Sequence, residues 1–202
     1  MELDPGSVDP TELYKLQIQI ITPRPIAWVS TVSADGVRNL APFSFSSGIG
    51  THPPAHLFCP TNRGDGTKKD TLRNVEATGE YVVGVVPYAV REAMNQTSAD
   101  YPPGVDEFVK AGLTPVPSLK VKPPRIKESP INMECRVLKI LHLGEGPHGS
   151  NVVIGEILHI HIDNAILRNG KIDPDLVDTI GRMSGPEYCR TTERFEMLRP
   201  KM

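Results

Sequence analysis

Cysteine is scarce in this sequence, and no two cysteines are spaced for a metal site or a disulfide framework. The three cysteines, Cys59, Cys135 and Cys189, are odd in number and widely separated, and no C-x-x-C motif occurs. A disulfide-stapled fold and a cysteine zinc site are therefore not predicted. Free thiols of this kind suit a reducing compartment, so we expect a cytoplasmic protein.

A long apolar run and an excess of basic residues are also absent. No apolar stretch approaches the roughly 20 residues that span a bilayer, and the amino-terminal sequence MELDPGSVDP lacks the features of a signal peptide. With 22 Lys and Arg against 24 Asp and Glu, the formal net charge is −2. We expect neither a membrane nor a nucleic acid as a partner, because nucleic-acid binders usually carry a basic face.

Motifs of acid–base catalysis, dinucleotide binding and metal binding are missing as well. Neither a Ser-His-Asp arrangement nor a carboxylate pair stands out, so we predict no catalytic side chain. No G-x-G-x-x-G motif follows a strand pattern, and the glycines of 143–149 indicate a hairpin turn because no helix follows them. His52 and His56 have the i, i+4 spacing of a helical zinc pair, but the two prolines between them prevent that helix, so no metal is predicted.

Proline and segments typical of β-strands are what the chain does contain. Its 202 residues include 20 prolines, about twice the usual share of ~5%. The length predicts one domain over 1–202, with a Pro-rich excursion at about 97–130 around a short helix near 105–111. Strands are expected at 26–32, 37–44, 56–59, 81–86, 133–143 and 152–162, and helices after Asp9 and over 71–77. This pattern favours a mainly β fold with short helices, a closed antiparallel barrel.

A hairpin in the first quarter of the chain carries a candidate cofactor edge. RPIAWVST (24–31) and NLAPFSFSSGIGTHPP (39–54) are joined through an Asp-Gly dipeptide, which supplies the positive φ angles of a tight turn. The second arm is rich in small polar side chains, namely Asn39, Ser44, Ser46 and Ser47. Such groups can donate and accept hydrogen bonds along a heteroaromatic ring, although a polar edge strand facing water is the alternative.

The segment TNRGDGTKKDTLRN (61–74) is typical of an anion site. Asp70 is a candidate N-cap for the helix that follows, so Thr71 and Leu72 would present free N–H groups to a phosphate. Four cations can add charge-assisted contacts: Arg63, Lys68, Lys69 and Arg73. The alternative is an ordinary solvated helix start.

In their order along the chain, these segments resemble the flavin reductase-like, FMN-binding split-barrel family, which includes flavoredoxin-like flavoproteins. The resemblance rests on RPIAWVST, NLAPFSFSS, Pro53-Pro54, KDTLRN (69–74), TGEYVV (78–83), ESPINMECRV (128–137), VVIGEILHIHID (152–163) and IGRMSGPEYCRT (180–191). Two short segments depart from the family pattern. The chain has Phe-Ser-Phe-Ser at 43–46 where the family commonly has FSFF, and Ser-Gly at 184–185 where the family has GG. The resemblance implies a six-stranded Greek-key split barrel, bound FMN, and a homodimer with FMN near the subunit junction.

The resemblance and the residue patterns together imply a cofactor site. Its predicted members are Arg24, Trp28, Ser30, Thr31, Asn39, Leu40, Ala41, Ser44, Ser46, Ser47, Lys69, Asp70 and Thr71. The phosphate is expected at 69–71 and the edge of the flavin ring at the main chain of 39–41. Trp28 has an equally weighted alternative as a core aromatic, and Arg24 has an alternative as a surface residue at a strand entrance.

On the substrate side, the resemblance adds His161, Arg182 and Tyr188. His161 would lie near the flavin or an incoming nicotinamide, and Arg182 and Tyr188 would reach the site of a partner subunit. The alternative for His161 is that it and His159, which share one strand face, are exposed to solvent or bond to each other. The alternative for Arg182 and Tyr188 is that the C-terminal segment packs on the protein without a role in the site.

The predicted function is that of an NAD(P)H-dependent flavin reductase that passes hydride to FMN. Hydride transfer requires no protein acid or base, because the cofactor carries the chemistry. One alternative is a flavoredoxin-like protein that keeps its FMN and exchanges electrons with a protein partner. Another is a structural module without a cofactor. An oxygenase or an electron carrier is the expected acceptor.

Overall fold

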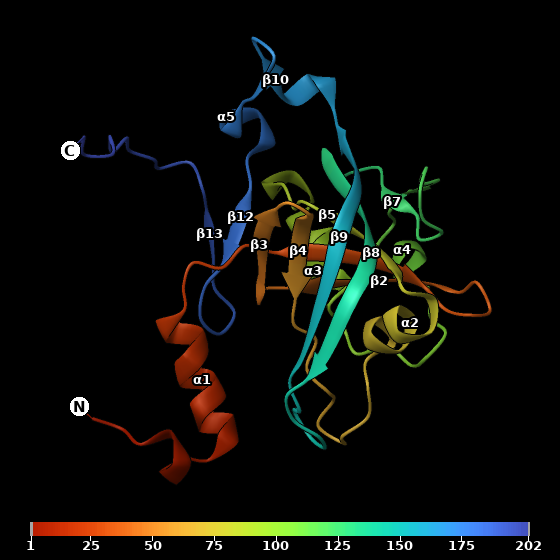
Figure 1. Cartoon of the computed structure of the whole chain (residues 1–202), viewed down its shortest axis with the longest axis vertical. Helices are drawn as coiled ribbons and strands as arrows, with labels where there is room; N and C mark the ends of the chain where they lie inside the picture. The colour runs from red at the N-terminus through yellow and green to blue at the C-terminus, as the bar shows by residue number, and fades with distance from the viewer. Residues whose placement is uncertain (1, 202) are drawn as a thin grey trace.

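A seven-stranded antiparallel sheet organises the chain in the computed structural model, which describes residues 2–201 (Figure 1). The strands follow the spatial order β2-β1-β5-β8-β9-β4-β3. Their bounds are β1 Ala27–Val32, β2 Arg38–Phe43, β3 Ser46–Thr51, β4 Pro54–Phe58, β5 Glu80–Gly84, β8 Ile131–His142 and β9 Asn151–Ile162. Short pairs outside this sheet are β6 Pro115–Val116 with β7 Arg125–Ile126, β10 Leu167–Arg168 with β11 Lys171–Ile172, and β12 Ile180–Arg182 with β13 Tyr188–Arg190.

Short helices occupy the connections between strands. The α-helices are α1 Pro10–Ile20, α2 Asp70–Thr78, α3 Arg91–Gln96, α4 Glu107–Lys110 and α5 Pro174–Val177. Single 3-10 turns are η1 Pro5–Ser7, η2 Tyr88–Val90 and η3 Asn164–Ile166. None of the helices formed by residues 2–201 has the length and apolar character needed to cross a membrane.

The predicted mainly β, antiparallel architecture is confirmed, and all six expected strands form. The main sheet has one strand more than the resemblance implied. After Phe45 the chain forms β3, which pairs with β4 and contains an irregularity between Gly48 and Gly50. The sequence SSGIGT of this strand has little β propensity, so pairing with its neighbour, and not local preference, makes it a strand.

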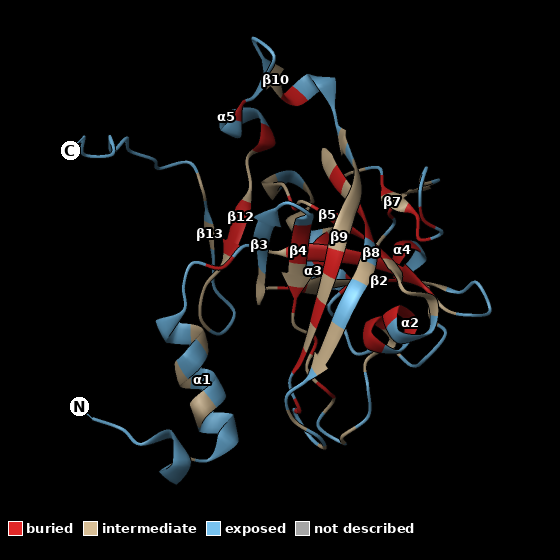
Figure 2. Ribbon diagram, in the orientation of Figure 1, coloured by how far each residue is buried: buried red, intermediate tan, exposed pale blue. Residues whose placement is uncertain are grey.

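Both faces of the sheet around β1 are covered, as the burial of all six β1 residues shows (Figure 2). Ala27 and Val29 point into one apolar cluster, while Trp28 points into another, because side chains alternate along a strand. The second cluster receives Phe108 from α4 and Ile126 from β7. The Pro-rich excursion therefore packs over the sheet, and its expected short helix forms as α4.

Helix α1 begins where the sequence predicts. The Asp9 carboxylate accepts hydrogen bonds from the amides of Thr11 and Glu12 at 2.9 and 3.3 Å, and Pro10 occupies the first helical position. None of the α1 residues is buried, and the helix stands away from the sheet (Figures 1 and 2). The apolar side of α1 is thus only partly covered in the single chain, where Tyr14 packs edge-on against Phe45.

Candidate functional site

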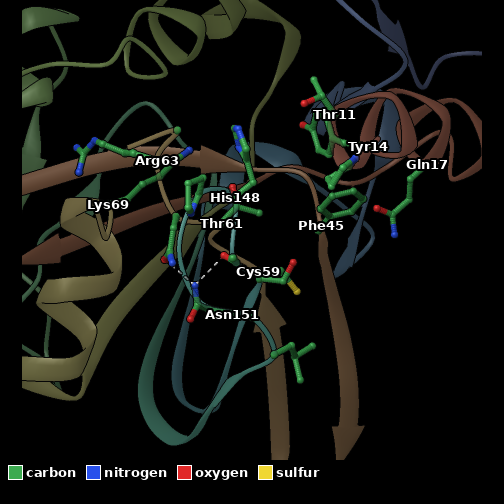
Figure 3. A pocket seen from close by; sticks show the side chains of 18 of the residues that line it. Thr11, Tyr14, Gln17, Phe45, Cys59, Thr61, Arg63, Lys69, His148 and Asn151 are labelled. Atoms are coloured by element: carbon green, nitrogen blue, oxygen red, sulfur yellow. Dashed lines mark hydrogen bonds between the residues drawn. The ribbon is translucent and has the colours of Figure 1, made fainter. Parts of the chain in front are cut away.

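Two adjoining cavities meet near the N-terminus of α2. One lies between α1, the segment after β4 and the turn of the β8–β9 hairpin, and the other lies between β2, the first turn of α2 and the segment 97–101. The larger has a volume of about 1110 Å³ and the smaller about 140 Å³. Figure 3 shows Tyr14 and Gln17 of α1 on one side of the larger cavity, and Arg63 and Lys69 on the other. Arg63 and Lys69 also line the smaller cavity, so this basic corner joins the two spaces.

Three of the four cations near α2 are already paired with carboxylates. The Arg63 guanidinium lies 3.1 Å from Asp100 and 3.5 Å from Asp70. Arg73 also pairs with Asp70. These contacts neutralise positive charge locally and hold the 63–68 loop in place, since Arg63 also donates to the Lys68 carbonyl at 2.7 Å.

Lys68 and Lys69 differ sharply although they are neighbours. The Lys68 ammonium lies 2.7 Å from the Glu76 carboxylate, whereas that of Lys69 has no hydrogen-bond or ion-pair partner among residues 2–201. Burial lowers the pKa of Lys69, because desolvation disfavours the charged form. Asp100 acts on the Lys69 charge from a longer distance and raises this pKa, but no carboxylate contacts the ammonium directly. A half-buried cation without a contacting carboxylate favours the binding of an anion.

Helix α2 adds free amide groups at the same corner. Its N-cap is Lys69, which makes no side-chain capping bond, so the first amides of α2 point out of the helix unsatisfied in the described structure. The prediction that Asp70 is the N-cap is wrong: Asp70 is the first helical residue, and Arg63 and Arg73 engage its carboxylate. Thr71 is buried and lines the smaller cavity beside Lys69. The corner therefore offers an ammonium, amides and a hydroxyl, a donor set that suits a phosphate.

Four other predicted cofactor residues lie in the protein interior and line neither cavity. Trp28 is 0% exposed, and its indole Nε1 donates to the Thr97 hydroxyl at 2.9 Å. Ser30 and Leu40 are equally buried, and the Leu40 amide donates to Glu107 at 2.9 Å. Of the two alternatives for Trp28, the core aromatic is the one that this structure supports. Thr31, also 0% exposed, lies directly behind α2 and contacts Asn39.

Arg24 has protein partners for each of its guanidinium nitrogens. It donates to the carbonyls of Ile18, Ile21 and Met183 at 2.7, 2.5 and 2.8 Å, and to the Ser44 hydroxyl at 3.3 Å. Burial lowers its pKa. Arg24 thus ties the end of α1 and the segment after β12 to the barrel, and the structure does not support a phosphate or ring-carbonyl clamp.

The serines of the second hairpin arm do not form one continuous edge. Ser44 accepts the bond from Arg24, Ser46 lies 2.9 Å from His56 Nε2, and exposed Ser47 donates to the neighbouring carbonyl of Gly48 at 2.9 Å. The chain bends between β2 and β3, which sends these hydroxyls to different surroundings. Ala41 does line the smaller cavity, together with Asn39.

Known proteins resemble this chain over most of its length. Residues 21–184 match the flavin reductase like domain. The chain belongs to the flavin reductase-like family. A protein of uncharacterised function from Aquifex aeolicus is 41% identical to it over 191 residues, which cover 94% of this chain and 95% of the relative.

Solved structures extend the agreement to the fold. Nitrilotriacetate monooxygenase component B from Bacillus cereus is 32% identical, with a TM-score of 0.92 over 98% of each chain. A split-barrel protein from Shewanella frigidimarina, 24% identical, has a TM-score of 0.82 over 99% of this chain and all of its own. The predicted split-barrel fold is confirmed, and membership of the flavin reductase-like family implies flavin binding.

The three predicted substrate-side residues lie outside both cavities of this family member. His161 is ten positions along β9 from Asn151, which lines the larger cavity; that separation is about 33 Å at ~3.3 Å per residue. His161 Nε2 is 2.6 Å from the fully buried Glu134. Arg182 packs over the Tyr188 ring at 4.5 Å on the β12–β13 hairpin. Within one chain, these side chains do not line the candidate cavities.

The β8–β9 turn is a wall of the larger cavity that the sequence did not reveal as such. Gly144, His148 and Gly149 line it. Asn62 fixes the turn by donating to the Gly146 carbonyl at 3.0 Å, and a Cβ at Gly149 would come within 2.9 Å of Asn62 Nδ2. The glycines of this segment indicate a turn in the sequence. Only the folded hairpin shows that the turn packs against the segment after β4.

Proposed function

We propose that this chain binds FMN and catalyses flavin reduction by NADH or NADPH. The observation that carries the proposal is Lys69, a half-buried ammonium without a partner in the described structure, next to the free amides of α2. Membership of the flavin reductase-like family supports the same ligand class. The basic corner has the chemistry of a phosphate site, which FMN needs and riboflavin does not.

Each part of the site has a separate task in this proposal. Lys69, the α2 amides and Thr71 bind the phosphate, and the larger cavity, about 1110 Å³, takes the rest of the molecule. When bound, the flavin supplies the capacity to accept a hydride and pass electrons on. The protein orients it: the pairing of Arg63 with Asp100 and Asp70 keeps the loop rigid while Lys69 stays available.

We also propose that two copies assemble into a homodimer with the flavin near their junction. Helix α1 borders the larger cavity but has no buried residue of its own. A second copy that covers α1 would also enclose the cavity. The relative from Bacillus cereus is named as a monooxygenase component, which supports an oxygenase as the consumer of reduced flavin here.

An absorbance titration tests the proposed activity. The purified protein is mixed with FMN and then, without oxygen, with NADH or NADPH. Bleaching of the flavin bands at a catalytic rate by one nucleotide is the expected result. Bound flavin that neither nucleotide reduces would instead favour an electron-transfer protein of the flavoredoxin kind, and failure to bind FMN would contradict both functions.

Two adjacent lysines provide a matched test of the phosphate site. Lys69→Ala should weaken FMN binding by roughly tenfold or more, because a charge-assisted contact is lost, and should leave riboflavin binding unchanged. Lys68→Ala is the control, since Lys68 is already paired with Glu76. Fluorescence titration with both flavins measures the ratio of FMN affinity to riboflavin affinity for each variant. Equal losses for the two variants would contradict the assignment of Lys69.

A further inference from the structure

Four polar side chains form a buried network directly behind the N-terminus of α2. Thr31, Asn39, Thr71 and Asn74 are all buried, with exposures of 0, 6, 1 and 7%. Asn39 Nδ2 lies 3.1 Å from Thr31 Oγ1 and 2.9 Å from Thr71 Oγ1. Asn74 Nδ2 lies 3.0 Å from Thr31 Oγ1. The network joins β1 and β2 to the first turn of α2.

The chemistry of the amide sets the direction of these bonds. An amide nitrogen only donates, so both threonine oxygens accept from Asn39. Thr31 Oγ1 receives a second N–H from Asn74, which fills its acceptor positions and holds the Asn39 amide in this orientation. Because Thr71 Oγ1 accepts from Asn39, its own proton is free for another partner.

The proton of Thr71 has no acceptor among residues 2–201. Thr71 lines the smaller cavity together with Lys69 and Asn39. An oxygen of an anion bound at Lys69 is therefore the acceptor that this geometry leaves for the hydroxyl.

We propose that Asn39 is a positioning residue that keeps the Thr71 hydroxyl as a donor to a phosphate oxygen. Thr31 and Asn74 in turn fix the orientation of Asn39. Asn39, on β2, therefore acts on the ligand only through the Thr71 hydroxyl. The inference rests on the proposed FMN function and deepens it, because it names the residue that aligns one donor of the phosphate site.

The test compares FMN with riboflavin, which lacks the phosphate, by fluorescence titration of the full-length protein. Asn39→Ala and Thr71→Val are each expected to weaken FMN binding by roughly tenfold and to leave riboflavin binding unchanged. Thr71→Ser, which keeps the hydroxyl, should retain most of the FMN affinity. Since Asn39 acts through Thr71, the double variant should bind FMN no more weakly than Thr71→Val alone.

Asn39→Asp tests the direction of the hydrogen bond between residue 39 and the Thr71 hydroxyl. Aspartate has the same shape but accepts at both oxygens, so Thr71 would donate to it and lose its free proton. FMN binding should fall at least as far as in Asn39→Ala, with riboflavin binding again unchanged.

Other outcomes would overturn the inference. Equal losses of FMN and riboflavin affinity in Asn39→Ala would mean a merely structural role, and multiplied losses in the double variant would mean that Asn39 does not act through Thr71. If the unaltered protein binds riboflavin and FMN equally, the phosphate site itself is wrong. If it binds neither flavin, the proposed function fails, and this result is distinct from an effect confined to the Asn39 variants.

Discussion

His56 is a buried histidine whose environment disfavours its charged form. It lies on β4 with 6% exposure, its Nε2 is 2.9 Å from Ser46 Oγ, and its Nδ1 has no partner within the described residues. Burial lowers the pKa of His56 from 6.5 to about 4. The unfolded chain therefore takes up this proton at a higher pH than the folded protein does.

Acidification should destabilise the protein through His56. Because the pKa is lower in the folded state, the stability present above pH 6.5 is lost as the pH falls toward 4, by up to roughly 3 kcal/mol. Urea unfolding at several pH values measures this slope. His56→Gln should remove that part of the slope, whereas His52→Gln, at an exposed site four residues earlier, should not. Identical slopes in all three proteins would contradict the prediction.

At the scale of elements, a close approach between strands depends on Gly155. This glycine of β9 lies opposite His56 of β4 in the sheet. A Cβ at Gly155 would come within 2.7 Å of Tyr81 Cε1. Tyr81 is fully buried on β5, and its hydroxyl donates to the His56 carbonyl at 3.3 Å. A single added methyl group would therefore push a core aromatic ring out of its place between β4, β5 and β9.

Gly155→Ala should destabilise the fold by about 1–3 kcal/mol, as overpacking of a close-packed core does. Gly48→Ala on edge strand β3 is the matched control, because nothing lies within 4 Å of its added Cβ; its effect should stay within about 0.5 kcal/mol. Denaturant unfolding of both variants gives the comparison. A stability of Gly155→Ala equal to that of Gly48→Ala would show that Tyr81 relaxes freely.

At the scale of the whole molecule, uncovered apolar side chains lie on α1 and near the C-terminus. On α1, Ile20 is 70% exposed. Phe195, Met197 and Leu198 are more than 80% exposed in the final segment. Apolar surface of this kind commonly marks an interface, which is the physical support for the proposed homodimer.

Sedimentation should find a species of twice the 22.1 kDa chain mass. Ile20→Asp is expected to weaken the assembly, because it places a charge on the apolar side of α1, whereas Gln19→Asp at the neighbouring exposed position should leave it intact. A monomer at all concentrations of the unaltered protein would contradict the dimer. Loss of the dimer in both variants would mean that added charge alone, and not the apolar contact of Ile20, is responsible.

Much of the fold was predictable because its signals are local. The N-cap of α1 depends on Asp9 and the two amides that follow it, and the strands depend on patterns within a few residues. The candidate site was predictable as a segment, 61–74, but not in its internal assignments. The sequence predicts Asp70 as the cap because a carboxylate at a helix start commonly is one, whereas in the folded chain two arginines pair with it.

The sequence by itself determined the mainly β architecture and the family, through motifs whose order and spacing survive without coordinates. Only the tertiary structure decided which cation is left for a ligand. Lys68 pairs with Glu76, eight residues later in the chain, and Arg63 pairs with Asp100 from a distant loop, whereas Lys69 makes neither contact. Trp28 likewise became a core residue when the excursion placed Thr97 and Phe108 beside it. Charge pairing and burial arise between elements far apart in the chain, so adjacent residues of the same type can have opposite roles.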